Sequence, residues 1–246
     1  MSFSQLTIYL SVGGVEVFTD GLARALIHRG FRVAVVTNRF GDEPRRENIG
    51  KGLEVVRLPN WSLVGGRLPM SRPGHEQKEL LHYLDGLDVR GVIVNTRFYP
   101  HSLIGARFAQ EHGLTPVVID HGADYLTFGN AALDVAVKAY EHAVTALIKR
   151  RNPAFYGISE ASSRWLRKFG IESRGVISNA IDAEGFCNSS SGRSFRGELG
   201  LREDVLLVTY SGRMIPEKGV DAIVGAAALL ATLRDDVAFV LAGDGP

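Results

Sequence analysis

Two cations, Arg213 and Lys218, follow a short apolar run at residues 205–210. The run predicts a buried strand, Gly212 predicts a tight turn, and the apolar spacing after Pro216 predicts a helix with Lys218 in its first turn. Because a cation is unfavourable at the positive end of a helix dipole, the pattern indicates that an anion binds there. A strand, a glycine turn and a helix N-terminus with two cations form a site for a phosphate or diphosphate. The alternative is that Glu217 or another carboxylate neutralises both cations on a solvated surface.

The composition limits the classes of protein to consider. The chain has 246 residues, 45% of them hydrophobic, and a formal net charge of +1, which is ordinary globular composition with room for one large or two ordinary domains. Without a basic excess the chain is not expected to bind nucleic acid, so any cationic site must be local.

Cysteine content and hydropathy predict the compartment. The one cysteine, Cys187, allows no internal disulfide and favours a reducing compartment. The longest strongly apolar run, residues 222–233, is too short to cross a bilayer, and the N-terminus lacks the basic start of a signal peptide. We therefore expect a soluble, cytoplasmic protein.

Paired glycines, Gly13 and Gly14, stand between two predicted strands at residues 6–10 and 31–37, with an amphipathic helix between the glycines and the second strand. Glycines at this position let a ligand approach the backbone at a helix N-terminus; the alternative is simply a tight turn. The unit lacks the G-x-G-x-x-G run and the acidic residue closing the second strand that bind a nicotinamide dinucleotide, so an oxidoreductase is the least favoured enzyme class.

Strands and helices continue to alternate along the chain, which predicts an α/β fold with doubly wound, Rossmann-like parallel sheets. Residues 41–51 and 61–74 predict loops, the second long, mobile and suited to holding substrate beside a cleft. Further strands are expected at residues 53–58, 91–95, 116–119, 154–158, 175–177 and 237–241, and further helices at residues 76–87, 102–112, 131–149 and 160–169.

Two polar residues follow predicted strands directly. Arg97 comes after the strand at residues 91–95, and His121 after the strand at residues 116–119. Ligands of open α/β sheets bind beyond the carboxyl ends of the strands, so we expect both side chains to project toward the site. His121 is then a proton carrier, a hydrogen-bond donor to a sugar or phosphate, or an inert turn residue.

The chain divides into unequal parts. We assign residues 1–182 to an N-terminal domain, residues 183–202 to a linker, and residues 203–246 to the start of a second domain. The last part supplies two strands and one helix, near the lower size limit for a stable domain, and a parallel strand pair needs both faces covered. We therefore expect the chain to stop inside its second domain.

Five separated segments together resemble glycosyltransferase family 4, a group with the GT-B fold. They are Gly-Gly-Val-Glu at 13–16, Asp-His-Gly at 120–122, Ile-Ser-Asn-Ala-Ile-Asp at 177–182, Ser-Gly-Arg-Met-Ile-Pro-Glu-Lys-Gly at 211–219 and Gly-Asp-Gly-Pro at 243–246. The resemblance implies two Rossmann-like domains facing each other across a cleft, with the acceptor on the N-terminal side and the nucleotide-sugar donor mainly on the C-terminal side.

The same resemblance implies a chemistry and a set of site residues. The chemistry is a metal-independent transfer, with retention and without a cofactor, from a nucleotide-diphosphate sugar to a glycan or lipid-linked acceptor. Cations stabilise the charge that develops on the leaving diphosphate. The implied catalytic residues are His121, Arg213 and Lys218, the diphosphate site adds Gly13, Gly14 and Gly212, and Arg97 and Asn179 are candidate acceptor or sugar contacts.

Departures from the family pattern keep other functions open. Ser178 and Ala180 stand where proline and glycine commonly flank the asparagine, and the later family segment with a pair of spaced glutamates is absent. The alternatives are a non-catalytic fragment that binds glycan or pairs with another protein chain, and a sugar-nucleotide epimerase. Peripheral association with the inner face of a membrane would rest on Arg67, Arg72 and the basic cluster at residues 149–151, for which a solvated surface is the simpler explanation.

Overall fold

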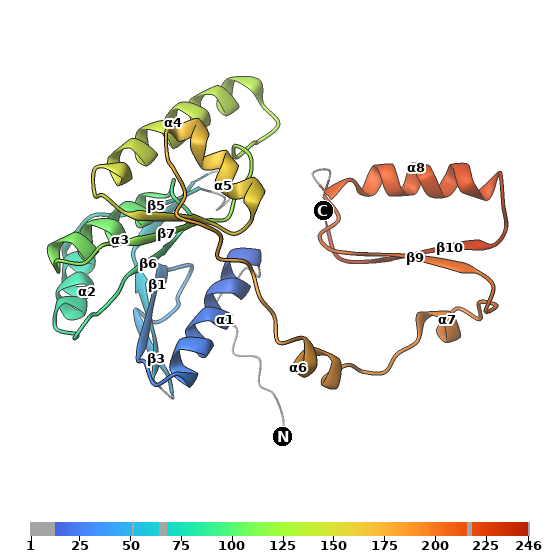
Figure 1. Ribbon diagram of the computed structural model, residues 1–246, viewed down its shortest axis with the longest axis horizontal. Helices are drawn as coiled ribbons and strands as arrows, with labels where there is room; N and C mark the ends of the chain where they lie inside the picture. Colours follow the sequence, from blue (N-terminus) through green and yellow to red (C-terminus); the bar gives the residue numbers. More distant parts are fainter. Residues whose placement is uncertain (1–12, 51, 64–67, 216–217, 246) are drawn as a thin grey trace. The chain divides into compact units, whose positions relative to one another are not determined.

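The computed structural model describes residues 13–50, 52–63, 68–215 and 218–245, and the chain divides into two compact units, residues 1–181 and 182–246. Figure 1 shows the helices and strands of both units, each of which is described by itself below. The strand predicted at residues 6–10 and the helix start predicted at Pro216 lie outside the described residues.

The first unit alternates strands with helices, as predicted. Its helices are α1 (Gly14–His28), α2 (His75–Asp85), α3 (Pro100–Glu111), α4 (Ala131–Lys149), α5 (Glu160–Leu166) and the short 3-10 helix η1 (Arg167–Phe169). Its strands are β1 (Val33–Asn38), β2 (Arg46–Gly50), β3 (Leu53–Leu58), β4 (Asn60–Leu63), β5 (Leu68–Ser71), β6 (Ile93–Asn95), β7 (Val117–Asp120) and β8 (Ala154–Gly157). β1 pairs in parallel with β3, and β7 lies between β6 and β8, also in parallel.

Both faces of β3 are buried, which accounts for helices on both sides of its sheet. Val55 packs in a cluster with Ala23 of α1, whereas Val56 packs in a cluster with Leu80 and Leu84 of α2. Successive strand residues point to opposite faces, so α1 and α2 cover opposite faces of the sheet. This confirms the predicted doubly wound arrangement.

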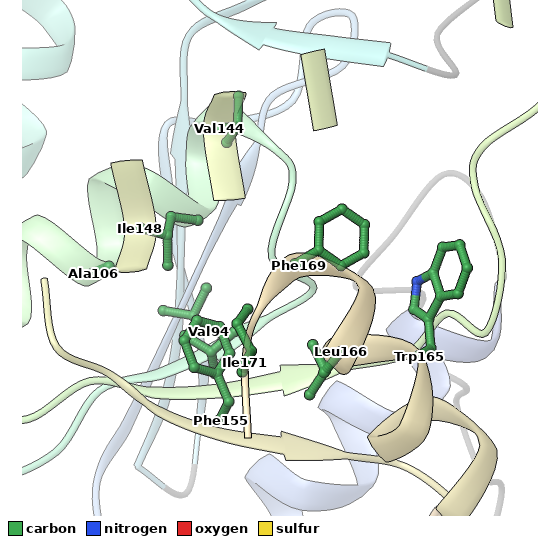
Figure 2. Packing of buried hydrophobic residues seen from close by; sticks show 10 residues of the cluster. Val94, Ala106, Val144, Ile148, Phe155, Trp165, Leu166, Phe169 and Ile171 are labelled. Carbon is green, nitrogen blue, oxygen red and sulfur yellow. The ribbon is translucent and has the colours of Figure 1, made fainter. Parts of the chain in front are cut away.

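The largest core lies where α3, α4, α5 and η1 pack on the sheet of β6, β7 and β8. Figure 2 shows how side chains from these elements converge, with Ile148 of α4, Phe155 of β8 and Leu166 of α5 all buried. Burying a large apolar side chain contributes about 1.5–3 kcal/mol. The core therefore holds the carboxyl ends of β6 and β7 firmly in place. Its members are Val94, Ala106, Val118, Val144, Ile148, Phe155, Trp165, Leu166, Phe169 and Ile171.

The prediction of a loop at residues 41–51 is wrong in part, because β2 occupies its second half and pairs antiparallel with β3. Charged side chains hold this pair together. Arg46 Nε lies 3.0 Å from Glu54 Oε1, and Arg57 Nη2 lies 2.7 Å from Glu47 Oε2. Because the stabilising cross-strand pairs are ionic, the segment has the composition of a solvated loop.

The prediction of a long mobile loop at residues 61–74 is also wrong for the part that is described. Strands β4 and β5 pair antiparallel, with Trp61 opposite Met70. Tyr140 of α4 directs its hydroxyl at Met70 Sδ, at 4.0 Å, so the hairpin lies against the body of the first unit.

The second unit contains α6 (Ala183–Asn188), α7 (Phe195–Glu198), β9 (Leu206–Ser211), α8 (Val220–Ala231) and β10 (Val237–Ala242). The short helices α6 and α7 lie within the predicted linker, and each begins at a side-chain cap, Asp182 and Ser194 respectively. β9 and β10 form a parallel pair with α8 as the crossover (Figure 1). Among the described residues of this unit, Val205 is the one buried hydrophobic side chain.

Candidate functional site

The N-terminus of α1 is formed by the paired glycines. Gly13 is the N-cap, with extended backbone, and its carbonyl accepts a hydrogen bond from the Val17 amide at 3.1 Å. A Cβ atom at Gly13 would overlap the Glu16 carboxylate, which folds back toward the start of the helix. A Cβ atom at Gly14 would meet no described atom within 4 Å. Because the end of the flexible Glu16 side chain can move aside, packing in the described residues requires a glycine at neither position.

His121 lies at the carboxyl end of β7 and joins a chain of hydrogen bonds that leads to α1. Its Nε2 is 3.1 Å from Asn95 Oδ1, at the end of β6. Asn95 Nδ2 donates to Thr19 Oγ1 at 2.9 Å, and Thr19 donates to the Val15 carbonyl at 2.7 Å. The imidazole also forms a T-shaped pair with the ring of Phe18, with the ring centroids 4.8 Å apart. Three elements thus fix the orientation of His121.

Burial lowers the pKa of His121 to about 4. The imidazole is therefore neutral at physiological pH. A neutral ring offers one N–H donor and one acceptor nitrogen, and carries no charge to neutralise a phosphate.

The prediction that Arg97 projects toward a ligand is wrong. Its side chain is fully buried, and its guanidinium bridges Asp120, at 2.9 and 3.0 Å, and Glu141, at 2.9 Å. The guanidinium carbon also lies 3.9 Å from the centroid of the Phe169 ring. A buried cation needs carboxylate partners, and the partners here come from other elements of the first unit. Arg97 therefore holds the strand ends together and is not available as an acceptor or sugar contact.

The two carboxylates of this ionic cluster differ from ordinary surface acids. Burial raises the pKa of Asp120 to about 6, against the opposing effect of Arg97. Burial likewise raises the pKa of Glu141, while a hydrogen bond from the Leu126 amide, at 2.8 Å, lowers it. The cluster links β7, α4 and the segment after β6.

Thr96 lies between Asn95, in the hydrogen-bond chain, and Arg97, in the ionic cluster. Its φ is 66°, in the left-handed region that a β-branched residue rarely adopts. Such strain costs about 1–3 kcal/mol and persists where the surroundings impose it. The Thr96 amide is held by the Ile119 carbonyl, at 2.8 Å. Strain at this one residue lets adjacent side chains serve two different networks.

Sequence reasoning did not select Asn95 or Thr19. Polar residues at the carboxyl ends of strands often contact ligands. Asn95 ends β6, so this rule applies to it as it does to Arg97 and His121. The pairing of Asn95 with Thr19, 76 residues away, has no local signal.

In the second unit, the loop after β9 and the loop after β10 pack backbone against backbone. The Gly212 amide donates to the Ala242 carbonyl at 3.0 Å, and the Met214 amide donates to the Asp244 carbonyl at 2.8 Å. A Cβ atom on Gly243 would overlap the Gly212 carbonyl oxygen. The loop that carries Arg213 therefore requires a glycine opposite it.

Arg213 and Lys218 are both exposed, and within the described ranges neither side chain forms a hydrogen bond or an ion pair. Lys218 does not lie in the first turn of α8, as predicted, but in 3-10 helical backbone just before it, where its amide donates to the Ile215 carbonyl at 3.0 Å. Gly219, with a φ of 70°, is the N-cap of α8, and Asp221 occupies the first turn. A left-handed residue cannot continue a helix backward, so Lys218 stands just before it. The two cations lie in the segment that follows the carboxyl end of β9, between Gly212 and Gly219.

Asn179 is exposed in the segment that follows the short bridge between Gly157 and Val176. No described residue bonds its side chain. The structure brings His121, Thr19 and the α1 glycines onto neighbouring elements of the first unit, while Gly212, Arg213 and Lys218 gather in the second.

Two residues of the basic cluster at residues 149–151 have partners within the first unit. Lys149 Nζ donates to the Phe169 and Gly170 carbonyls at 2.7 and 3.1 Å, and Arg151 Nη1 donates to Gln110 Oε1 at 3.0 Å. Lys149 thus caps the end of η1. Arg72 Nη2 lies 3.6 Å from Glu76 Oε2. Arg67 lies outside the described residues. Among the helices that the structure describes, none has the length and hydropathy required to cross a membrane.

Comparison with known proteins connects these features to a family. The chain is 26% identical over 248 residues to one subunit of the human phosphatidylinositol N-acetylglucosaminyltransferase, covering 97% of this chain and 46% of that protein. It is 26% identical over 218 residues to a putative teichuronic acid biosynthesis glycosyltransferase of Bacillus subtilis, covering 87% of this chain and 54% of that protein. The chain thus spans about half the length of these curated relatives.

A third curated relative matches a shorter part of the chain, and a solved structure has a similar fold. Over 86 residues, 33% of this chain and 23% of the other, identity is 31% with the lipopolysaccharide 1,2-N-acetylglucosaminetransferase of Salmonella typhimurium. The sucrose-phosphate synthase of Thermosynechococcus elongatus superimposes with a TM-score of 0.61 at 17% identity, covering 94% of this chain and 57% of that one. This likeness confirms the predicted GT-B fold. The sequence model described as Glycosyltransferase Family 4 matches residues 12–184, most of the chain, and the protein therefore belongs to glycosyltransferase family 4.

Proposed function

We propose that the protein transfers a sugar from a nucleotide-diphosphate sugar to a glycan or lipid-linked acceptor, with retention of configuration and without a metal ion or cofactor. Arg213 and Lys218 carry the proposal. Both side chains are exposed, and within the described residues, which do not include Glu217, no carboxylate neutralises either cation. Exposed cations without a described carboxylate partner, beyond the carboxyl end of a parallel strand, are suited to the donor diphosphate.

The cations have a catalytic role as well as a binding role. When the glycosidic bond breaks, negative charge accumulates on the leaving diphosphate, and Arg213 and Lys218 stabilise that charge most when it is fully developed. Each charge-assisted contact contributes about 1.5–3 kcal/mol. Because α8 begins only after Lys218, the stabilisation comes from the charges of the two side chains rather than from a lysine inside the helix.

The diphosphate site in this proposal also includes Gly13, Gly14 and Gly212. Gly14 is the most informative of the three, because no described neighbour requires a glycine there. A diphosphate that approaches the start of α1 would supply the missing reason, since the first amides of a helix have no partner within it. Asn179, exposed and without a described partner, remains a candidate sugar or acceptor contact.

The names of the relatives suggest which substrates to test first. Two of these names give N-acetylglucosamine as the transferred group. One also names phosphatidylinositol, and the other names lipopolysaccharide. We therefore favour N-acetylglucosamine as donor sugar, a lipid-linked acceptor, and action at the cytoplasmic face of a membrane with peripheral association. One relative is named as a subunit, so pairing with a second protein chain is part of the proposal.

The test is transfer by the purified protein. It is incubated with nucleotide sugars that differ in base and sugar, with and without lipid-linked acceptors, in the presence of a chelator. Mass spectrometry measures the product, and proton NMR of the new linkage gives its anomeric configuration. Retained configuration with chelator present supports the proposal, whereas inverted product or metal dependence contradicts it. A donor epimerised without acceptor would establish the epimerase alternative, and tight glycan binding without turnover the non-catalytic one.

A further inference from the structure

The hydrogen-bond chain that ends at His121 begins with a backbone carbonyl, and this fixes the direction of every bond in it. Thr19 donates its hydroxyl proton to the Val15 carbonyl, at 2.7 Å. A threonine hydroxyl has a single proton, so Thr19 Oγ1 can only accept from its other neighbour.

That neighbour is Asn95, whose side-chain amide is thereby oriented. Its Nδ2 donates to Thr19 Oγ1 at 2.9 Å, so its Oδ1 faces His121. A carbonyl oxygen only accepts, and His121 Nε2, at 3.1 Å, must carry the proton. The tautomer of the ring is therefore set by Thr19, two steps along the hydrogen-bond chain from His121.

The opposite nitrogen of the ring, Nδ1, is then a bare acceptor. No described residue bonds it, and the ring is half-buried. The preceding residue, Asp120, turns its carboxylate to Arg97, and Phe18 presents only carbon to the imidazole. Nothing in these contacts favours a second proton on the ring.

We infer that Thr19 and Asn95 are positioning residues that hold His121 with Nδ1 unprotonated, so that this nitrogen accepts a hydrogen bond from a hydroxyl group of the donor sugar. The inference rests on the proposed function for the identity of the ligand. An acceptor nitrogen attracts a hydroxyl and repels phosphate oxygens, so this inference assigns a sugar hydroxyl rather than a phosphate to His121.

The tautomer is measured directly by nitrogen-15 NMR of the protein, independently of any activity. The resonances of His121 are identified as those absent from the H121Q spectrum. We expect a pyrrole-type shift for Nε2 and a pyridine-type shift for Nδ1 in the wild type. A protonated Nδ1 would overturn the inference, whatever reaction the protein performs.

A matched pair of variants tests the role of Thr19. Thr19→Ser keeps the hydroxyl, and we expect the wild-type tautomer. Thr19→Val keeps the shape and removes the acceptor, so the Asn95 amide can turn over, and we expect a mixture of both tautomers. An unchanged tautomer in folded Thr19→Val would overturn the positioning role. If that variant does not fold, the wild-type spectrum alone still decides the state of Nδ1.

Binding measurements connect the tautomer to the ligand. We expect Thr19→Val to weaken the binding of a nucleotide sugar about threefold to tenfold and to leave the binding of the nucleoside diphosphate unchanged, while Thr19→Ser binds both like the wild type. Equal weakening of both ligands contradicts the assignment of the hydroxyl to Nδ1. The absence of nucleotide-sugar binding in the wild type, with the expected spectrum, would contradict the proposed function instead.

Discussion

Arg97 Nη1 lies 2.9 Å from Asp120 Oδ1, in the residue directly before His121, and both side chains are fully buried. The same guanidinium reaches Glu141 of α4. A side chain that was expected to meet a ligand thus fixes the strand end from which His121 projects.

Replacing Arg97 should destabilise the first unit strongly. Arg97→Leu leaves two carboxylates buried without their cation, and losing one partner of a buried pair costs about 3–5 kcal/mol. Urea unfolding followed by circular dichroism measures the loss. The control is Arg107→Leu, which removes an exposed i,i+4 pair with Glu111 and should change stability by less than about 0.5 kcal/mol. Similar values for the two variants would show that the buried cluster contributes no more than a surface pair.

The depressed pKa of His121 predicts a specific loss of stability in acid. The unfolded chain gains a proton on this side chain near pH 6.5, whereas the folded protein gains it only near pH 4. The contribution of neutral His121 to the free energy of unfolding is therefore fully present above pH 6.5 and is lost as the pH falls to about 4. Because part of the ring is open to solvent, we expect a loss of about 1–2 kcal/mol.

The difference between wild type and H121Q isolates this effect. The raised pKa of Asp120 acts in the opposite direction, since a proton bound at low pH favours the fold, but it is common to both proteins and cancels. Urea unfolding of each protein at pH 7 and at pH 4.5 gives the change in its free energy of unfolding over this range. If H121Q loses as much stability as the wild type over this range, the prediction is wrong.

Removing the cations should weaken diphosphate binding without unfolding the protein. Arg213→Ala and Lys218→Ala each remove a charge-assisted contact, so we expect each to lower affinity for a nucleoside diphosphate by about tenfold to a hundredfold. Calorimetric titration provides the measurement. Arg202→Ala is the matched control, because it removes an exposed arginine that pairs with Asp204 at 3.0 Å, and its affinity should equal that of the wild type.

Gly14→Ala separates binding from packing. No described atom lies within 4 Å of the added methyl group, and alanine favours a helix over glycine by up to about 1 kcal/mol. We expect unchanged or slightly higher thermal stability together with weaker binding of the nucleotide sugar. Wild-type affinity in this variant would remove the start of α1 from the proposed diphosphate site.

Local signals in the sequence predicted most of the first unit. The helix expected at residues 131–149 is α4, which begins after Asn130, whose side chain accepts hydrogen bonds from the Ala132 and Leu133 amides. The strand expected at residues 53–58 is β3, whose apolar residues are buried on both faces. Periodicity and caps are properties of neighbouring residues, so they can be recognised without the fold.

Features that depend on distant partners were not predictable in this way. The partners of Arg97 are 23 and 44 residues away, and no short-range pattern indicates that their carboxylates enclose it. Strand β2 was missed for a related reason, since its charges are neutralised by residues of β3 rather than by solvent. The start of α8 was misplaced because the left-handed backbone of Gly219 is a conformational choice that the residue type permits without requiring.

The close backbone contact between Gly212 and Gly243 constrains any attempt to graft new specificity onto this scaffold. Two amide-to-carbonyl bonds couple the loop after β9 to the loop after β10, and a Cβ atom at Gly243 or Gly245 would overlap a carbonyl oxygen of the loop after β9. A donor loop taken from another transferase would therefore have to be transplanted as a two-part cassette, with residues 211–215 and 242–245 exchanged together.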